Sequence, residues 1–127
     1  MGKIDKVRKM DVKELVGRYS NGERDFKGVD LSHADLCNLD LTGINLEGSD
    51  LYKANLYKAT LKGANFSSSN LIDADFLGAD VRDANFEFAD LTNAGFTDAD
   101  VTNANFTDAV ISGVRIRFGN RVVIIKE

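Results

Sequence analysis

The residue types that most often carry catalysis or bind metals are sparse in this chain. Its only histidine, His33, lies four residues before its only cysteine, Cys37. These two side chains are fewer than the four ligands of a structural zinc site, so we expect both to be ordinary surface residues. The sequence contains no Gly-rich phosphate loop and no Ser-His-Asp set. It therefore predicts a protein that is not an enzyme and that has no catalytic residue, metal ligand or cofactor.

Acidic and amide side chains recur at a spacing of five residues, from Asp25 and Asp30 through Asn65 and Asn85 to Asn105. Such a row could bind a ligand, but it could also serve the backbone. Asp and Asn side chains accept hydrogen bonds from nearby backbone groups and tolerate the conformations of tight turns. Because the regularity of the row follows turn chemistry, we favour a structural role for it over a binding site.

Between Phe26 and Ile116, every fifth residue is apolar, and the Asp and Asn side chains lie next to these apolar residues. In most units an Ala lies two residues before this apolar centre, Asp or Asn lies directly before it, and a turn former lies two residues after it. A period of five matches neither the 3.6 residues of a helix turn nor the alternation of a flat strand. It predicts a chain that bends once in every unit. The centres are Phe26, Leu31, Leu36, Leu41, Leu46, Leu51, Leu56, Leu61, Phe66, Leu71, Phe76, Val81, Phe86, Leu91, Phe96, Val101, Phe106, Ile111 and Ile116.

The number of bends in one coil follows from residue types that repeat at a longer interval. Residues 64–83 match residues 84–103 at nine of twenty positions. Taking every fourth centre sorts the centres into four columns. One column is rich in Phe, and the column that follows it, which begins at Leu31, contains no Phe. We therefore predict a coil of four sides and about twenty residues. The column richest in aromatic residues contains Phe26, Leu46, Phe66, Phe86 and Phe106.

The unit Ala-(Asp/Asn)-(Leu/Phe)-x-x, repeated over residues 26–116, resembles the pentapeptide repeat proteins. The segment ELVGRYSNGERDFKGVDLSHADL is similar to small members common in cyanobacteria. This resemblance implies an all-β solenoid, a right-handed quadrilateral β-helix in which the centre and the Ala two residues before it point inward. The larger Leu39 and Ile44 predict uneven packing in the first coils. The chain departs from the pattern at Arg24, Leu39, Ile44, Ser49, Thr60, Ser69, Gly95 and Val110.

The length predicts one domain, which we divide into an N-terminal arm and capping helix at 1–25, the β-helix at 26–116 and a C-terminal cap or strand at 117–127. Asp11 followed by Glu14 is typical of an N-cap and its partner. We therefore expect a short helix at about residues 12–20 that covers the first coil, after a loosely packed arm at residues 1–10.

The C-terminal residues predict a hairpin, with two strands joined by a tight turn at Gly119 and Asn120. A bare edge at Val122, Val123, Ile124 and Ile125 would invite pairing with another chain. We expect this segment either to fold over the last coil or to form the seam of a homodimer.

One group of outward positions departs from the polar character of the walls. Tyr52 and Ile72 fall in one column and Tyr57 and Leu77 in the adjoining column, with a lysine beside each tyrosine. Aromatic residues clustered on a polar surface are typical of a partner site, although single exposed apolar residues are normal. The candidate partner patch is Tyr52, Lys53, Tyr57, Lys58, Ile72 and Leu77.

Flat faces without a predicted pocket favour a non-catalytic protein-interaction module with an unidentified protein partner. The resemblance also implies an alternative, because some pentapeptide repeat proteins mimic DNA and bind DNA gyrase or another nucleic-acid-binding protein. Nearly five coils spaced ~4.8 Å apart make a rod of roughly 23 Å. A DNA mimic of that length needs about 14 net negative charges, since duplex DNA carries one per ~1.7 Å. Residues 26–114 carry fourteen acidic and five basic residues, a net charge of −9, and these charges are spread over all four sides. Because this is fewer than a DNA mimic needs and forms no single acidic stripe, we favour the interaction module.

The overall composition limits the partners and the compartment. A net charge of −4 lacks the basic excess of a protein that binds nucleic acid directly. The single cysteine forbids an internal disulfide. We find no apolar run of roughly 20 residues that could span a bilayer, and the charged start MGKIDKVRKMDVKEL is unlike a secretory signal. We therefore expect no membrane association and a cytoplasmic protein.

Overall fold

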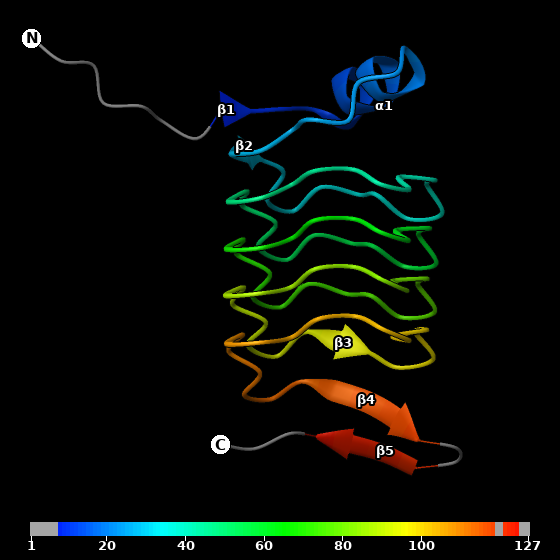
Figure 1. The fold of residues 1–127 in the computed structure, drawn as a ribbon, viewed down its shortest axis with the longest axis vertical. Coiled ribbons are helices and arrows are strands. Elements are labelled where there is room, and N and C mark those ends of the chain that lie inside the picture. Colours follow the sequence, from blue (N-terminus) through cyan, green and yellow to red (C-terminus); the bar gives the residue numbers. More distant parts are fainter. Residues whose placement is uncertain (1–7, 119–120, 125–127) are drawn as a thin grey trace, which may run out of the picture.

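The computed structural model describes residues 8–118 and 121–124, in which the chain winds into a solenoid of stacked coils (Figure 1). A helix lies at the N-terminal end of the stack, and an antiparallel strand pair lies at the C-terminal end. Isolated bridges rather than long strands hold most of the coils together. The elements are β1 (Arg8–Lys9), α1 (Val12–Ser20), β2 (Val29–Asp30), β3 (Gly95–Phe96), β4 (Arg115–Phe118) and β5 (Arg121–Ile124).

Parallel bridges join residues that are twenty positions apart, such as Asp25 and Asn45. Four bridges form in each coil, one at the residue before each centre. In the first of them, the Phe26 N–H donates to the Asn45 carbonyl at 2.8 Å and the Asn45 N–H donates to the Arg24 carbonyl at 2.7 Å. This spacing confirms the predicted twenty-residue coil. We number the sides by the centres of the first coil: side one at Phe26, side two at Leu31, side three at Leu36 and side four at Leu41.

Each side ends in a four-residue turn, such as the one in which the Ala54 N–H donates to the Leu51 carbonyl at 2.9 Å. The third residue of these turns has a positive φ, as a type II turn requires. Lys53 (φ 54°) and Phe88 (φ 61°) adopt this conformation although each carries a Cβ. Such a residue costs roughly 1–2 kcal/mol and persists only where the surrounding structure fixes it. The bonds to adjacent coils therefore determine the corners more than local preference does.

The core is a single stack of inward-pointing centres. From Leu31 to Phe96, every centre is at most 1% exposed. The Phe66 and Phe86 rings stack at a centroid distance of 5.1 Å, and the Phe86 and Phe106 rings stack at 4.9 Å. Each fully buried side chain of this kind contributes about 1.5–3 kcal/mol. The aromatic column predicted from the sequence is therefore continuous over three coils.

Some departures from the repeat are absorbed in the core and others are not. Ile44, which replaces an inward Ala, is completely buried, whereas Leu39 is only half-buried. The hydroxyl of Ser49 donates to the Phe26 carbonyl of the preceding coil at 3.3 Å, and that of Ser69 donates to the Phe66 carbonyl, three residues earlier in the chain. Because a buried hydroxyl is costly without a hydrogen bond, these contacts explain how Ser is tolerated there.

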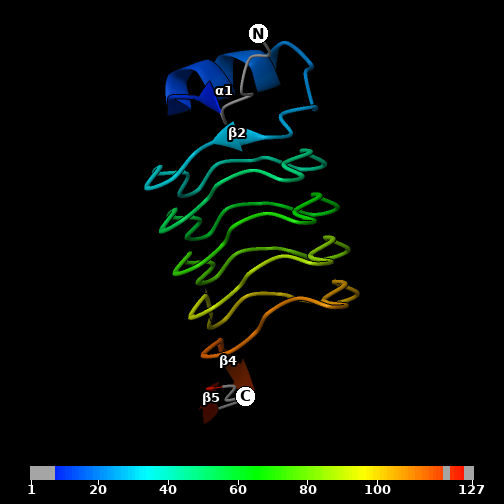
Figure 2. The same cartoon turned by 90° about the vertical axis from the view of Figure 1, so that its left-hand side faces the viewer.

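The helix predicted at residues 12–20 is confirmed as α1. Its N-cap is Asp11, whose carboxylate accepts a hydrogen bond from the Glu14 N–H at 2.8 Å. Leu15 projects from α1 into the core and is completely buried. Figure 2 shows α1 lying across the end of the stack.

The expectation of a loosely packed arm is wrong for residues 8–10. β1 pairs in parallel with β2, and the Met10 N–H donates to the Asp30 carbonyl at 3.0 Å. Met10 is 2% exposed and belongs to the hydrophobic core. Residues 8–10 therefore add a short strand above side two. The five-residue pattern does not predict this strand, because the pattern begins only at Phe26. Residues 1–7 of the expected arm lie outside the described residues.

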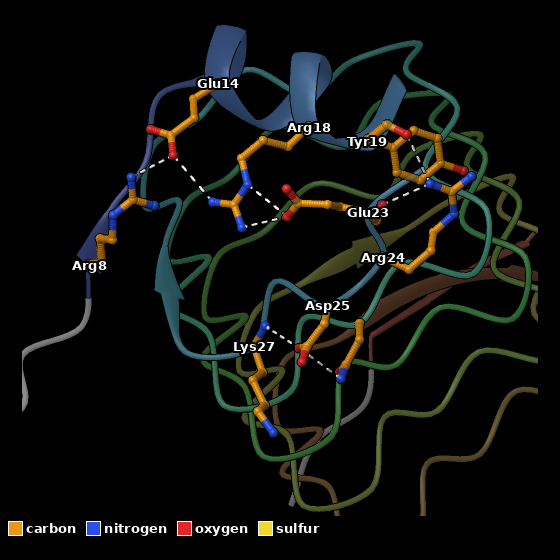
Figure 3. A network of polar contacts seen from close by, with 9 residues as sticks. Arg8, Glu14, Arg18, Tyr19, Glu23, Arg24, Asp25 and Lys27 are labelled. Carbon is orange, nitrogen blue, oxygen red and sulfur yellow. Dashed lines mark hydrogen bonds and ion pairs between the residues drawn. The ribbon is translucent and has the colours of Figure 1, made fainter. Parts of the chain in front are cut away.

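The outer face of the N-terminal end is polar (Figure 3). Glu14 accepts hydrogen bonds from Arg8 and from Arg18, and the Arg18 guanidinium also pairs with Glu23 at 2.6 Å. The hydrogen bond from Arg8 lowers the pKa of the Glu14 carboxyl below its ordinary value. Since terminal repeats of a solenoid need a polar outer surface, this network suits an end that faces solvent.

At the C-terminal end, β4 pairs in parallel with β3 and antiparallel with β5. Gly95 stands where most units carry Asp or Asn, and the Arg115 guanidinium occupies the space beside it. A Cβ on Gly95 would lie 3.2 Å from Arg115 Nη2 and 3.7 Å from Asp75 Oδ1. β4 and β5 lie where two strands are predicted. The predicted turn residues, Gly119 and Asn120, and the edge residue Ile125 lie outside the described part.

The last coil is less buried than the coils above it. Phe106 and Ile111 are partly exposed, whereas Phe86 and Leu91, one coil above, are completely buried. A hollow of about 170 Å³ opens at this end, and the side chains around it are all apolar. It is lined by Leu91, Phe96, Phe106, Ile111, Val114 and Ile116.

Candidate interaction surface

The Asp and Asn row serves the turns, which confirms its predicted structural role. The Asp50 carboxylate accepts a hydrogen bond from the Tyr52 N–H at 3.0 Å, and the Asn55 side chain accepts one from the Tyr57 N–H at 3.0 Å. The same contact recurs along the row, so each Asp or Asn side chain bonds the backbone two residues ahead. Local bonds of this kind stabilise turns, and they account for the regular spacing without any ligand.

Threonine hydroxyls strengthen two of these contacts on side four. Thr42 Oγ1 donates to Asp40 Oδ1 at 2.6 Å, and Thr102 Oγ1 donates to Asp100 Oδ1 at 2.6 Å. These hydrogen bonds, together with those from the backbone N–H groups, hold the pKa of Asp40 and Asp100 below the ordinary aspartate value. The charged form of both carboxyls is therefore favoured in the folded protein.

The double variant Asp40→Asn, Asp100→Asn is expected to be less sensitive to acid than the parent. A lowered folded-state pKa gives stability that is fully present above the ordinary aspartate value of about 4 and is lost as the pH falls through the lowered pKa. Asparagine keeps the turn contact, as Asn85 does when it accepts from the Glu87 N–H at 2.9 Å, but it does not titrate. Urea unfolding at neutral pH and below about pH 3 measures the difference. Equal acid losses in both proteins would contradict the assignment.

The two tyrosines of the candidate patch each lie beside the lysine that follows them. Lys53 Nζ is 5.5 Å from the centroid of the Tyr52 ring, and Lys58 Nζ is 5.3 Å from that of Tyr57. Both lysines are exposed and both tyrosines are half-buried. Contacts of this geometry are cation–π interactions, worth about 0.5–1 kcal/mol at exposed sites. Each corner therefore presents an aromatic face with an attached positive charge.

The aliphatic members of the patch lie one coil further along the stack. The Lys53 N–H donates to the Ile72 carbonyl and the Lys58 N–H donates to the Leu77 carbonyl, both at 2.9 Å. Ile72 is half-buried and Leu77 is 36% exposed. A Cβ at Gly78 would lie 3.1 Å from Lys58 Cγ, so the lysine stem runs along the wall beside Leu77. The backbone register thus places the predicted residues on two neighbouring corners of successive coils.

His33 and Cys37 lie one coil before Tyr52 and Tyr57 of the patch, as the backbone register shows. The exposed His33 ring meets the Tyr52 ring edge-on at a centroid distance of 5.5 Å. Cys37 is a half-buried free thiol whose pKa is raised by its hydrogen bond to Asp35. Within residues 8–118 and 121–124, no group of three His, Cys, Asp or Glu side chains could hold a metal ion. No helix in the described part is long and apolar enough to cross a membrane.

Two exposed apolar residues and one hollow were not part of the predicted patch. Phe88 is 61% exposed at a corner where most units carry a turn former, and Val110 is 47% exposed in the row of Asp and Asn. Both stand out in the sequence as apolar residues at outward positions. The other feature is a hollow beside α1, whose single sequence signal is Leu39 at a position where most units have Ala.

Comparison with known proteins agrees with the coil geometry. The family model of pentapeptide repeats matches in eight copies over residues 30–67, 49–87 and 69–108. A search of curated protein sequences finds no match. The structure of alr5209, a pentapeptide repeat protein from Nostoc PCC 7120, is similar with a TM-score of 0.60 and 30% identity, over 88% of this chain and 84% of that one.

Two further solved structures are more distant. AT2G44920, a pentapeptide repeat protein of the Arabidopsis thaliana thylakoid lumen, is 24% identical over 80% of this chain and 73% of that one, with a TM-score of 0.39. Rfr23 from the cyanobacterium Cyanothece 51142 is 24% identical over 80% of this chain and 92% of that one, with a TM-score of 0.38. On the strength of the family model and of alr5209, this chain belongs to the pentapeptide repeat family.

Proposed function

We propose that this protein is a non-catalytic interaction module that presents rigid, flat faces to another protein. One observation carries the proposal: from Leu31 to Phe96 the coils are filled by centres at most 1% exposed, so these coils offer no internal site and can contact a partner only through their outer walls. Membership of the pentapeptide repeat family supports the same reading. The proposal includes a right-handed quadrilateral coil, α1 as the N-terminal cap, the β4–β5 pair as a C-terminal hairpin cap, and a cytoplasmic location.

We propose that the candidate partner patch is the contact surface; it consists of Tyr52, Lys53, Tyr57, Lys58, Ile72 and Leu77. The tyrosines supply area that is buried at low conformational cost. Lys53 and Lys58 border this apolar centre and give it a positive rim. A partner with an apolar centre and an acidic border would complement both properties.

The double variant Tyr57→Ser, Leu77→Ser is expected to lose the partner while keeping the fold, since neither side chain belongs to the core. Pull-down from the native cell extract compares it with the parent, and circular dichroism follows the fold. The matched control is Glu87→Ser, Thr107→Ser, which changes outward residues at the corner of side one and should retain the partner. A patch variant that captures every protein the parent captures would remove the patch from the proposal.

We also propose a homodimer that forms through the C-terminal end. Among the described strands, β5 pairs only with β4, so its other edge offers free backbone groups. The adjoining hollow is apolar, and the half-buried Phe106 and Ile111 line it. The N-terminal end differs, because α1 there buries Leu15 in the core and carries ion pairs on its outside. Two copies joined C-terminus to C-terminus would bury both apolar ends and form a closed pair.

A further inference from the structure

The first coil lacks a backbone partner on side four. In the coils below, the residue before each side-four centre is bonded to the coil above: the Thr60 N–H donates to the Leu39 carbonyl at 2.9 Å, and the Leu41 N–H donates to the Thr60 carbonyl at 2.8 Å. The equivalent residue of the first coil is Asp40. Within the described part of the chain, no backbone group pairs with the N–H or the carbonyl of Asp40. Both groups point to the place that a further coil would occupy.

Side two shows how such a place is filled. There β1 lies above β2, and the Met10 N–H donates to the Asp30 carbonyl at 3.0 Å. This is the bond that a centre makes in every regular coil, and Met10 is buried like a centre. A short extended segment that is not part of the repeat can therefore add to the first coil. The fold itself contains the precedent for an added strand.

On side four the free edge borders a hollow of about 470 Å³ between α1 and the wall. Apolar side chains from both sides line it: Val16 of α1, which is 37% exposed, and the half-buried Leu39 of the coil. Most units have Ala at the position of Leu39, so the wall is more apolar here than the repeat requires. The volume lies within the range of about 300–1,000 Å³ that is usual for ligand pockets.

Tyr19 and Arg24 also line the hollow, and each makes a contact that fixes its side chain. The Tyr19 hydroxyl donates to the Thr42 carbonyl at 2.8 Å, which replaces the bond that a regular coil would make to that oxygen. The Arg24 guanidinium lies 3.7 Å from the centroid of the Tyr19 ring and donates to the Tyr19 carbonyl at 2.9 Å. On side four of the first coil, the N–H and the carbonyl of Asp40 are therefore the backbone groups that remain available for a bond to an added strand. Two such groups suit a short segment and not a complete coil.

We propose that an extended segment of a partner protein adds to the first coil at Asp40, with a large apolar side chain in the hollow between Val16 and Leu39. Strand addition of this kind draws affinity from backbone bonds and specificity from side-chain pockets. The residue before the apolar one would face Asp40, and an amide suits it. On side one, where Asn45 of the second coil pairs with Asp25 of the first, Asn45 Nδ2 donates to Asp25 Oδ1 at 3.4 Å. The expected ligand thus contains an Asn followed by a Leu or a residue of similar size, and it recognises a site separate from the proposed patch.

The experiment uses the full chain labelled with ¹⁵N and a capped peptide, acetyl-Gly-Ala-Asn-Leu-Thr-Gly-amide. Titration is expected to give a saturable downfield shift of the Asp40 amide, because its N–H gains an acceptor. Replacing the peptide Leu by Ala is expected to weaken binding roughly tenfold, since the buried side chain is lost. A peptide with N-methylleucine at that position cannot donate to the Asp40 carbonyl and is expected to bind more weakly still.

The protein variant Val16→Lys places a charge in the hollow and is expected to abolish the shift. Its matched control is Val110→Lys, the same change at an exposed valine on the last coil, which should bind as the parent does. The patch variant Tyr57→Ser, Leu77→Ser should also bind the peptide, so that failure of one proposal is distinguished from failure of the other. An Asp40 amide that does not shift overturns the inference. Equal affinity of the Leu→Ala peptide and the parent peptide overturns it as well. Both of these results are measured on the parent protein, so they do not depend on whether the Val16→Lys protein folds.

Discussion

The variant Phe86→Ala is expected to lower the free energy of unfolding by about 3–5 kcal/mol, the usual cost of truncating a buried Phe. The Phe86 ring is completely buried and lies between two parallel rings, Phe66 at 5.1 Å and Phe106 at 4.9 Å. It also meets Phe76 and Phe96 edge-on at 5.7 and 5.8 Å. Its removal leaves a cavity that no mobile side chain can fill, because the bridges on all four sides fix the spacing of the coils.

Urea unfolding followed by circular dichroism measures this loss, and Glu87→Ala is the control. Glu87 is the next residue in the chain but lies outside the core, so its truncation should cost within about 0.5 kcal/mol. A total stability of 5–15 kcal/mol is usual for a domain, so the Phe86 variant is expected to approach the limit of folding. Similar losses in the two variants would contradict the inward and outward assignment on side one.

Deletion of residues 119–127, which removes β5, is expected to convert a dimer into aggregating or monomeric protein. Without β5 the edge of β4 is exposed, and free strand edges pair readily with other chains. The apolar side chains of the last coil, such as Phe106 and Ile111, also lose any cover that this segment or a second copy provides. Since an uncapped solenoid exposes its core at the end, the melting temperature should fall as well.

Light scattering after size-exclusion chromatography measures the mass, and thermal unfolding measures the stability. Deletion of residues 1–7 is the control, because it shortens the chain at the other end and leaves β1 and α1 in place. A parent protein that is already monomeric would contradict the dimer. A truncated protein with unchanged mass and unchanged melting temperature would show that the C-terminal segment neither caps nor assembles the coils.

The sequence predicts the coils well because each coil repeats the same physical requirement. Phe66, Phe86 and Phe106 fall twenty residues apart, and in the structure their rings stack in register. The turn chemistry is equally local, since an Asp or Asn bonds the backbone two residues ahead. Periodicity and local bonding therefore suffice for the middle of the molecule.

The N-terminal end could not be predicted in the same way, because it contains no repeat. Met10 occupies the place of a centre, but it pairs above Asp30 through β1, and neither its type nor its spacing marks it as part of a coil. The hollow on side four depends on how α1 rests on the first coil, which is a matter of tertiary packing. Leu39 signalled only that the packing there would be uneven. The members of the patch were predictable as outward residues, whereas the contacts of Lys53 and Lys58 with their tyrosines depend on side-chain conformation.

The twenty-residue interval between bridged residues restricts how such a chain can change in length. Loss of five residues from the middle would keep every remaining centre inward, yet it would turn all later units by a quarter of the circumference. If the five residues are lost between Phe86 and Phe106, Phe106 no longer lies over Phe86, and surface residues that shared a corner across the deletion are carried to different walls. Loss or duplication of twenty residues preserves both the interior and the alignment of the walls. Insertions and deletions in multiples of four units are therefore the changes of length that leave a recognition surface intact.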